Sequence, residues 1–316
     1  MGNITFTSRR SVEGKYVVLA GCDSGIGELV LRDLCLLKAN VIALCYTPEG
    51  VSNAKTIGAK AAILCDVTKE EDILRAVDEI KLLTHGNWIN SFIYCAGVAI
   101  SGFIEFQTME NYRRVMEVNY FGAVSLTLKL LPLLRKKEND DDALNGKTEN
   151  KESKRIVFVS SVCGLVALPG CSPYSASKFA MEAFASTLRF ELKDSNISVS
   201  LINPGTMKTA IATTYFDIFA ATHERAIKED TSGELVKLYS REWCKEYVKE
   251  GHAIVSKAMD NPKLASNDIV HAVIAWVPQW RYLSGPAAKG IYYLLWSLPE
   301  SWSFFLKKCL PGKKPY

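Results

Sequence analysis

Six short apolar runs alternate with helical patterns along the first two thirds of the 316-residue chain. The runs lie at 16–20, 41–45, 61–65, 92–95, 156–160 and 199–202, and helical spacing is clearest at 73–83, 112–134 and 176–192. Strands that are apolar along their whole length are typical of a parallel sheet with helices on both faces. This alternation predicts an α/β fold with a doubly wound parallel sheet.

A glycine-rich turn, Gly-Cys-Asp-Ser-Gly-Ile-Gly at 21–27, joins the first predicted strand to apolar residues at helical spacing. Glycine lets the backbone turn tightly and approach a pyrophosphate, which binds at the positive end of the following helix. A glycine triplet is also common in ordinary turns, so its interpretation depends on the other motifs of the chain.

A tyrosine and a lysine four residues apart, Tyr174 and Lys178, lie in the third helical pattern. This spacing places both on one helix face, where the ammonium group favours the phenolate and lowers a tyrosine pKa of about 10 toward neutrality. A phenol with such a pKa is a general base. Ser161, just after a predicted strand, could hydrogen-bond the same substrate oxygen.

The carboxyl ends of parallel strands meet at one edge of the sheet, and this edge holds the ligand cleft in folds of this class. The glycine turn, Asp66, Gly97, Ser161 and Pro204 each follow a predicted strand. We therefore expect these motifs to converge on one site.

Several motifs share the order and spacing of one known family. They are the glycine turn, Cys-Ala-Gly at 95–97, Asn119, Ser161, Tyr174 with Lys178, and Pro-Gly-Thr-Met-Lys-Thr at 204–209. On these motifs the chain resembles the classical subgroup of the short-chain dehydrogenase/reductase family. Residues 177–184, 281–285 and 298–301 further resemble the branch of retinol dehydrogenases, 17-beta-hydroxysteroid dehydrogenase type 2 and 3-hydroxybutyrate dehydrogenase.

The resemblance implies a Rossmann-type sheet and a single domain over 1–316. Within it, 12–209 would be the dinucleotide-binding and catalytic core, and 210–262 a small helical substrate lobe. Residues 263–316 would form a C-terminal helix, a strand and an apolar tail, and the polar run at 136–154 a disordered insertion.

The resemblance also implies the site residues. The catalytic residues would be Asn119, Ser161, Tyr174 and Lys178, with Asn119 holding a water that links Lys178 to solvent. The cofactor contacts would be Gly21, Asp23, Ser24, Gly25, Ile26, Gly27, Asp66, Val67, Ala96, Gly97, Tyr174, Lys178, Pro204, Gly205, Met207 and Thr209. Cys95 departs from the family pattern, which has an asparagine there that braces the central strand.

The residues expected at the adenosine ribose favour NAD over NADP. A 2′-phosphate normally needs a nearby arginine or lysine. The glycine turn instead offers Asp23, and Glu49 follows the second predicted strand. The chain also departs from the common NAD pattern, because Cys45 and Tyr46 stand where an acidic residue would bind both ribose hydroxyls.

Large apolar side chains in the expected substrate lobe predict a lipophilic substrate. We expect Phe216 and Phe219 to contact it beside Ser161 and Tyr174, and no cationic cluster stands out that would bind a small carboxylate. The predicted activity is oxidation of a secondary or allylic alcohol of retinoid or hydroxysteroid type. The alternatives are a 3-hydroxybutyrate-type dehydrogenase and a non-catalytic dinucleotide-binding regulator, which the intact catalytic set disfavours. The epimerase/dehydratase branch has a different glycine spacing.

Composition gives no reason to expect nucleic acid or metal as a partner. The net charge is +4, and the nine cysteines and four histidines form neither a Cys-x-x-Cys nor a His-Glu-x-x-His motif. We therefore expect no metal site and no redox dithiol, and interpret the cysteines as buried apolar residues in a reducing compartment.

Aromatic residues at 291–298 and 302–306, with lysines nearby, suit either peripheral contact with a membrane or packing over the pocket. We expect an intracellular protein, cytoplasmic or peripheral on the endoplasmic reticulum membrane, with a mitochondrial location left open. The helical patterns at 112–134 and 176–192 carry the faces through which the family forms homodimers or homotetramers.

Overall fold

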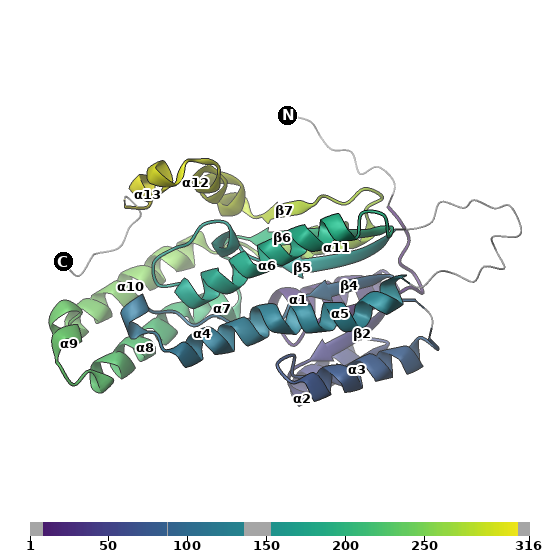
Figure 1. The fold of residues 1–316 in the computed structure, drawn as a ribbon, viewed down its shortest axis with the longest axis horizontal. Coiled ribbons are helices and arrows are strands. Elements are labelled where there is room, and N and C mark those ends of the chain that lie inside the picture. Colours follow the sequence, from purple (N-terminus) through teal and green to yellow (C-terminus); the bar gives the residue numbers. More distant parts are fainter. Residues whose placement is uncertain (1–8, 87, 136–152, 309–316) are drawn as a thin grey trace, which may run out of the picture.

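The computed structural model describes residues 9–86, 88–135 and 153–308. Its centre is one sheet of seven parallel strands in the order β3-β2-β1-β4-β5-β6-β7 (Figure 1). The strands are β1 (Tyr16–Ala20), β2 (Asn40–Cys45), β3 (Ala61–Leu64), β4 (Ser91–Tyr94), β5 (Lys154–Val159), β6 (Ile197–Pro204) and β7 (Arg281–Ser284). The predicted doubly wound α/β fold is confirmed.

The six strands predicted from the sequence are all present, and their ends differ from the prediction by at most two residues. The predicted insertion at 136–154 lies outside the described residues up to position 152. Its last residue, Lys154, is instead the first residue of β5, because the strand register pairs it with Ile197 of β6.

Helices cover both faces of the sheet and create two hydrophobic cores (Figure 1). One face holds α1 (Gly25–Leu36), α2 (Pro48–Ile57) and α11 (Lys263–Ile274), and the other holds α3 (Glu70–Leu83), α5 (Gly122–Arg135) and α6 (Ser172–Glu191). Successive strand residues point to opposite faces. In β1, Val17 and Leu19 belong to the first core and Val18 and Ala20 to the second. This is why the strands are apolar throughout.

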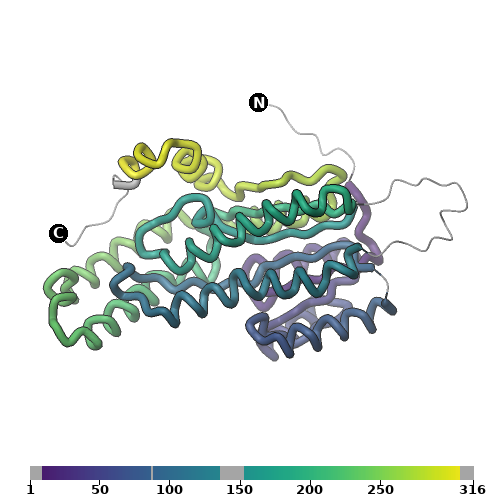
Figure 2. The backbone as a smooth tube through the Cα atoms, viewed as in Figure 1, coloured from purple at the N-terminus to yellow at the C-terminus, as the bar shows by residue number. Residues whose placement is uncertain are grey.

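A long helical rod packs beside α6, and Figure 2 shows it as one continuous coil. The sequence predicts an unbroken helix over 112–134, but the rod consists of α4 (Met109–Met116), a π turn (Glu117–Phe121) and α5. A π turn widens the helix and often marks a functional position. Here the Val118 carbonyl accepts a hydrogen bond from the Tyr94 hydroxyl of β4, and the neighbouring Asn119 is fully buried.

Beyond the carboxyl ends of the strands lies a helical lobe (Figure 1). It consists of α7 (Ala210–Thr213), α8 (Tyr215–Glu229), α9 (Glu234–Leu238) and α10 (Arg241–Ala258). Helices α8 and α10 pack side by side around aromatic rings. The centre of the Phe219 ring lies 4.8 Å from the centre of the Tyr247 ring and 5.2 Å from that of Phe103, a residue that follows β4. The lobe therefore has its own core, which Phe103 and Phe106 of the segment after β4 complete.

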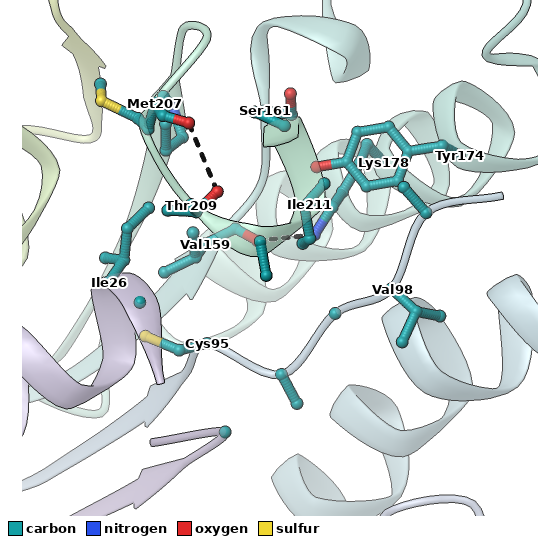
Figure 3. Close-up of a pocket in the computed structure, with 18 of the residues that line it drawn as sticks. Ile26, Cys95, Val98, Val159, Ser161, Tyr174, Lys178, Met207, Thr209 and Ile211 are labelled. Atoms are coloured by element: carbon teal, nitrogen blue, oxygen red, sulfur yellow. Dashed lines mark hydrogen bonds between the residues drawn. The ribbon is translucent and has the colours of Figure 1, made fainter. Parts of the chain in front are cut away.

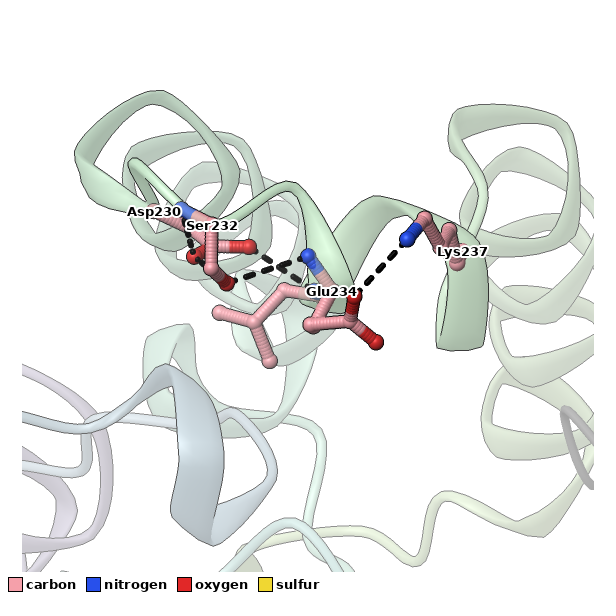
Figure 4. Close-up of polar contacts among 5 residues, drawn as sticks. Asp230, Ser232, Glu234 and Lys237 are labelled. Atoms are coloured by element: carbon pink, nitrogen blue, oxygen red, sulfur yellow. Dashed lines mark hydrogen bonds and ion pairs between the residues drawn. The ribbon is translucent and has the colours of Figure 1, made fainter.

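One carboxylate shapes the turn between α8 and α9 at the tip of the lobe (Figure 4). Asp230 accepts backbone hydrogen bonds from Ser232 at 3.0 Å and from Leu235 at 2.8 Å. The hydrogen bond from the Ser232 hydroxyl is the main cause that lowers the Asp230 pKa. Glu234, in the first turn of α9, pairs with Lys237 at 2.7 Å.

After β7 the chain forms a π turn (Ala288–Tyr292), α12 (Tyr293–Ser297) and α13 (Glu300–Lys308). Leu295 is buried, whereas Trp302 is 66% exposed. Across residues 9–86, 88–135 and 153–308, no helix has the length and apolar character needed to cross a membrane.

A buried charged network joins α6, β6 and β7. Glu182 of α6 forms an ion pair with Arg281 of β7 at 2.6 Å and accepts a hydrogen bond from Asn203 of β6, also at 2.6 Å. Asn203 also donates to the Ser161 carbonyl at 2.9 Å. The Glu182 side chain is only 10% exposed, so these partners replace water in stabilising its charge. The network thereby holds the backbone at Ser161.

Glu182→Ala should lower the free energy of unfolding by about 3 kcal/mol, because it removes the negative charge that pairs with Arg281 and one of the two acceptors of the buried Asn203 amide. Urea denaturation measures this change. Lys81→Ala is the matched control, because the exposed Lys81–Asp78 pair should contribute less than about 0.5 kcal/mol. Equal effects of the two substitutions would contradict a structural role for the network.

Candidate active site

A cleft of about 610 Å³ runs along the carboxyl ends of the strands and into the helical lobe. Every residue that the resemblance assigned to the cofactor lines it, as do Ser161, Tyr174 and Lys178. Figure 3 shows Ile26 and Thr209 on the opposite side of the view from Tyr174 and Lys178. Asn119 lies behind the wall and is fully buried.

The glycine turn requires glycine at two positions. Gly21 has a φ of 78°, and a Cβ atom there would lie 2.3 Å from the backbone nitrogen of Ala96. A Cβ atom at Gly27 would lie 2.0 Å from the Gly21 carbonyl oxygen. Helix α1 begins at Gly25, and in the described part of the chain the Ser24 side chain makes no capping hydrogen bond. The N–H groups of the first turn of α1 can therefore bind an anion in the cleft.

Asp23 braces the glycine turn, a role that the sequence did not indicate. Its carboxylate accepts backbone hydrogen bonds from Tyr46 at 3.0 Å and Thr47 at 2.9 Å, and a third from the Thr47 hydroxyl at 2.9 Å. Gly50 is needed beside it, because a Cβ atom there would lie 2.2 Å from an Asp23 oxygen. Asp23 thus ties the turn to the start of α2. Glu49, which we expected at the ribose, is not among the residues that line the cleft.

Other predicted cofactor contacts are held by short local hydrogen bonds. The Asp66 carboxylate accepts from the backbone and hydroxyl of Thr68 at 3.0 and 2.8 Å, and the Asp66 N–H donates to Asp72 at 2.9 Å. On the other side of the cleft, the Thr209 N–H donates to the Met207 carbonyl at 2.8 Å. Both segments therefore present fixed backbone groups to the cleft.

Ser161, Tyr174 and Lys178 meet at one place in the cleft. Tyr174 and Lys178 lie one turn apart on α6, and Ser161 follows β5. Lys178 Nζ donates to the Val159 carbonyl at 2.9 Å and lies 5.5 Å from the centre of the Tyr174 ring (Figure 3). The lysine is therefore anchored to the backbone beside the phenol.

Burial moves both ionisable groups of α6 toward their neutral forms. It raises the pKa of Tyr174, against a smaller opposite effect of the hydrogen-bonding Ser161 hydroxyl. It lowers the pKa of Lys178 to about 8, and Cys95 and Glu182 partly offset this change. The predicted lowering of the Tyr174 pKa is therefore wrong for the free protein, because desolvation of the phenol outweighs the attraction to Lys178. A Lys178 pKa near 8 lets its amine exchange a proton close to neutral pH.

Three hydrogen bonds hold Asn119. Its amide oxygen accepts from the Val98 N–H at 2.8 Å, and its amide nitrogen donates to the Val98 carbonyl and the Ser177 hydroxyl, each at 2.9 Å. Asn119 therefore ties the loop after β4 to the helix that carries Lys178. Its role in a water relay stays a prediction.

Cys95 stands where the family has an asparagine, yet the strand beside it is regular. Its N–H donates to the Ala20 carbonyl at 2.8 Å, which extends the pairing of β4 with β1. Desolvation raises the pKa of its thiol to about 12. The central strand is thus held here by backbone hydrogen bonds and an uncharged thiol.

The lobe end of the cleft is apolar, and one predicted contact there is wrong. Phe216 lines the cleft, but Phe219 does not, because it is fully buried in the aromatic core between α8 and α10. The sequence missed other lining residues, since nothing in it indicated which loops fold over the cleft. They are Leu168, Pro169 and Cys171 before α6, Tyr247 and Val255 of α10, and Tyr292 of the C-terminal π turn.

The chain matches the family model described as short chain dehydrogenase over residues 15–217. It is 29% identical over 290 residues to retinol dehydrogenase 7 of Mus musculus, and this alignment covers 91% of the present chain and 86% of the mouse protein. It is 31% identical over 296 residues to 17-beta-hydroxysteroid dehydrogenase type 6 of Bos taurus, and this alignment covers 92% of the present chain and 86% of the bovine protein.

Solved structures share the fold. A short-chain dehydrogenase/reductase of Burkholderia phymatum in complex with NAD superimposes with a TM-score of 0.70 at 18% identity, covering 97% of this chain and 99% of that one. A short-chain dehydrogenase of Burkholderia cenocepacia in complex with NADP superimposes with a TM-score of 0.66 at 21% identity. This superposition covers 94% of the present chain and 98% of the Burkholderia chain. The family model spans more than half of the chain and confirms the resemblance found in the motifs. The chain belongs to the short-chain dehydrogenase/reductase family of NAD(P)-dependent oxidoreductases.

Proposed function

We propose that this protein is an NAD-dependent dehydrogenase that oxidises a secondary or allylic alcohol of a lipophilic substrate, of retinoid or hydroxysteroid type. One observation carries the proposal: Ser161, Tyr174 and Lys178 meet in a cleft that continues into an apolar lobe. The described lining residues of that lobe and of the C-terminal π turn include no lysine, arginine or histidine. The names of the curated relatives, retinol dehydrogenase and hydroxysteroid dehydrogenase, support the same substrate class.

The cleft fits a nicotinamide dinucleotide. The close approaches at Gly21 and Gly27 form a cradle that any Cβ atom would fill. The first turn of α1 would hold the pyrophosphate, Asp66 the adenine, and Thr209 the carboxamide. When bound, the nicotinamide supplies the hydride acceptor or donor.

Side chains of this protein would accept and transfer the alcohol proton. Tyr174 would take the hydroxyl proton of the alcohol, while Ser161 hydrogen-bonds the same oxygen and stabilises its developing carbonyl form. Lys178 would bind the nicotinamide ribose, and its charged form would stabilise Tyr174 as the phenolate, the form that can accept the alcohol proton. Asn119 would keep α6 and the loop after β4 in register.

The surface supports two further proposals about partners. Exposed apolar side chains on the rod and on α6, among them Phe121, Leu128 and Phe190, suit self-association of two copies. Exposed aromatic side chains on α12 and α13, among them Trp296 and Trp302, suit peripheral contact with a membrane such as that of the endoplasmic reticulum.

Tyr174→Phe should lower kcat with a retinoid or steroid alcohol by about a thousandfold, because it removes the proton acceptor. NADH affinity, measured by fluorescence titration, should change by no more than a few-fold. Tyr112→Phe is the matched control, since its hydroxyl bonds Ser172 at 2.7 Å outside the cleft. Substantial turnover by Tyr174→Phe would refute the assignment.

The ratio of kcat/KM for NAD and NADP should favour NAD by at least about tenfold, or about 1.4 kcal/mol. The reason is that Asp23 is acidic, and the cleft-lining cations in the described chain, Arg114 and Lys178, belong to neither the glycine turn nor the segment after β2. Tyr46 is 57% exposed at the end of β2, so Tyr46→Arg should improve the use of NADP. Tyr46→Phe controls for loss of the hydroxyl. Equal use of both cofactors by the unaltered protein would overturn this interpretation.

Ile211→Ala should raise KM for a polyene or fused-ring alcohol roughly fivefold to tenfold with little loss of stability, because Ile211 lines the cleft and is 38% exposed. Phe219→Leu is the matched core substitution. It should lower the free energy of unfolding by about 1–2 kcal/mol and leave KM unchanged. Steady-state kinetics and thermal unfolding separate the two effects. The apolar-pocket hypothesis fails if 3-hydroxybutyrate proves the better substrate.

A further inference from the structure

Two cysteines lie in the cleft wall between Ser161 and Tyr174. Cys163 is in the 3-10 turn (Val162–Gly164) just after Ser161, and Cys171 precedes α6, three residues before Tyr174. Both residues line the cleft, are 9% and 8% exposed, and belong to the same small buried cluster, in which each thiol shifts the pKa of the other. The sequence predicted no redox dithiol because seven residues separate this pair, which hides it from a search for Cys-x-x-Cys.

We propose that Cys163 and Cys171 form a reversible disulfide when the protein meets hydrogen peroxide, so that the wall of the substrate cleft is a site of oxidative modification. The two thiols share access from the cleft. A second pair does not, since Cys22 and Cys45 have sulfur atoms 3.6 Å apart but do not line the cleft and are almost fully buried. That pair is an internal comparison, because its sulfur atoms are close together but have no access from the cleft.

Cys171 is placed to react first. Its thiol lies 3.3 Å from the Tyr215 hydroxyl, and it sits at the N-terminal end of the 20-residue helix α6. A helix N-terminus and a donated hydrogen bond both favour a thiolate. In agreement, the hydrogen bond from Cys163 is the main cause that lowers the Cys171 pKa, while the Cys163 pKa is raised.

The chemistry balances with peroxide as the oxidant. The Cys171 thiolate attacks one peroxide oxygen, the O–O bond breaks, and a sulfenic acid forms as hydroxide leaves and takes up a proton. The Cys163 sulfur then attacks the sulfenic sulfur, so that the S–S bond forms, the S–O bond breaks and water leaves. In total, two thiols lose two electrons and two protons, and one peroxide becomes two waters.

The disulfide would displace both segments that hold catalytic side chains, the turn after Ser161 and the start of α6. The Cys163 N–H donates to Ser161 Oγ at 3.1 Å, so rotation of Cys163 would disturb the Ser161 hydroxyl. Cys171 is the residue from which the helix of Tyr174 begins, and its thiol would no longer be available to Tyr215. We therefore expect oxidation to lower turnover, a consequence that rests on the proposed function, whereas the modification itself does not.

Peptide mapping of the full chain tests the modification. After peroxide, the protein is alkylated with iodoacetamide and digested with trypsin, which releases both cysteines in the single peptide 156–178. This peptide should be two hydrogens lighter and unalkylated, and dithiothreitol should restore alkylation at both positions. In the same sample, Cys22 and Cys45 should still react with iodoacetamide once the protein is denatured. A peptide 156–178 that stays fully alkylatable, or that reaches sulfonic acid without a disulfide, would overturn the proposal.

Single substitutions test the order of events. In Cys163→Ser, Cys171 should be trapped as its dimedone adduct, whereas Cys171→Ser should leave Cys163 unlabelled. Labelling of Cys163 instead would overturn the assignment of Cys171 as the attacking thiol.

Turnover tests the consequence. The unaltered protein should lose activity by about tenfold with peroxide and recover with dithiothreitol, while Cys171→Ser should keep most of its own untreated rate. Cys35→Ser, outside the cleft, should stay as sensitive as the unaltered protein. A disulfide that forms without loss of turnover would contradict only the predicted effect on activity. A protein that is inactive before peroxide treatment would contradict the proposed function.

Discussion

The close contact between the glycine turn and the backbone at Ala96 is the constraint on which the cleft depends. A side chain at Gly21 would push the turn away from the loop after β4, and one at Gly27 would push α1 away from the first residues of the turn. The first turn of α1 would then no longer face the loop that carries Gly97 and Val98. Asp23 adds to this constraint, because its carboxylate fixes the start of α2 against the same turn. Three strands thus contribute their ends to one rigid rim.

Desolvation then governs the chemistry of that rim. Tyr174 and Lys178 are both buried in α6, and each is shifted toward its neutral form. A site with this property carries little charge by itself, so the charges that a substrate or cofactor brings are felt more strongly than they would be in water. The two thiols of the wall are about equally buried, so their neighbours distinguish them. Cys171 has the Tyr215 hydroxyl and the N-terminal end of α6 beside it, whereas the pKa of Cys163 is raised, mainly by Cys171 and by burial.

The helical lobe packs around its own aromatic core, part of which also borders the cleft. Its aromatic core between α8 and α10 contains Phe219 and Tyr247 and takes in Phe103 from the sheet domain. The face toward the cleft is left to residues such as Ile211 and Phe216. Ile211 can therefore differ with little effect on the packing of the lobe, whereas Tyr247 belongs to both the core and the cleft wall.

The sequence by itself determined the sheet, the glycine turn and the meeting of Ser161, Tyr174 and Lys178, because these follow from local periodicity and from the rule that parallel strands end at one edge. Only the tertiary structure decided which apolar residues face the cleft. Phe216 and Phe219 are equivalent by spacing, yet one lines the cleft and the other fills a core, because Phe219 also packs against the rings of the segment after β4. The sequence wrongly predicted a lowered pKa for Tyr174, because desolvation by the surrounding segments raises it. The contact of Cys163 with Cys171 arises from a loop fold that no short-range pattern encodes.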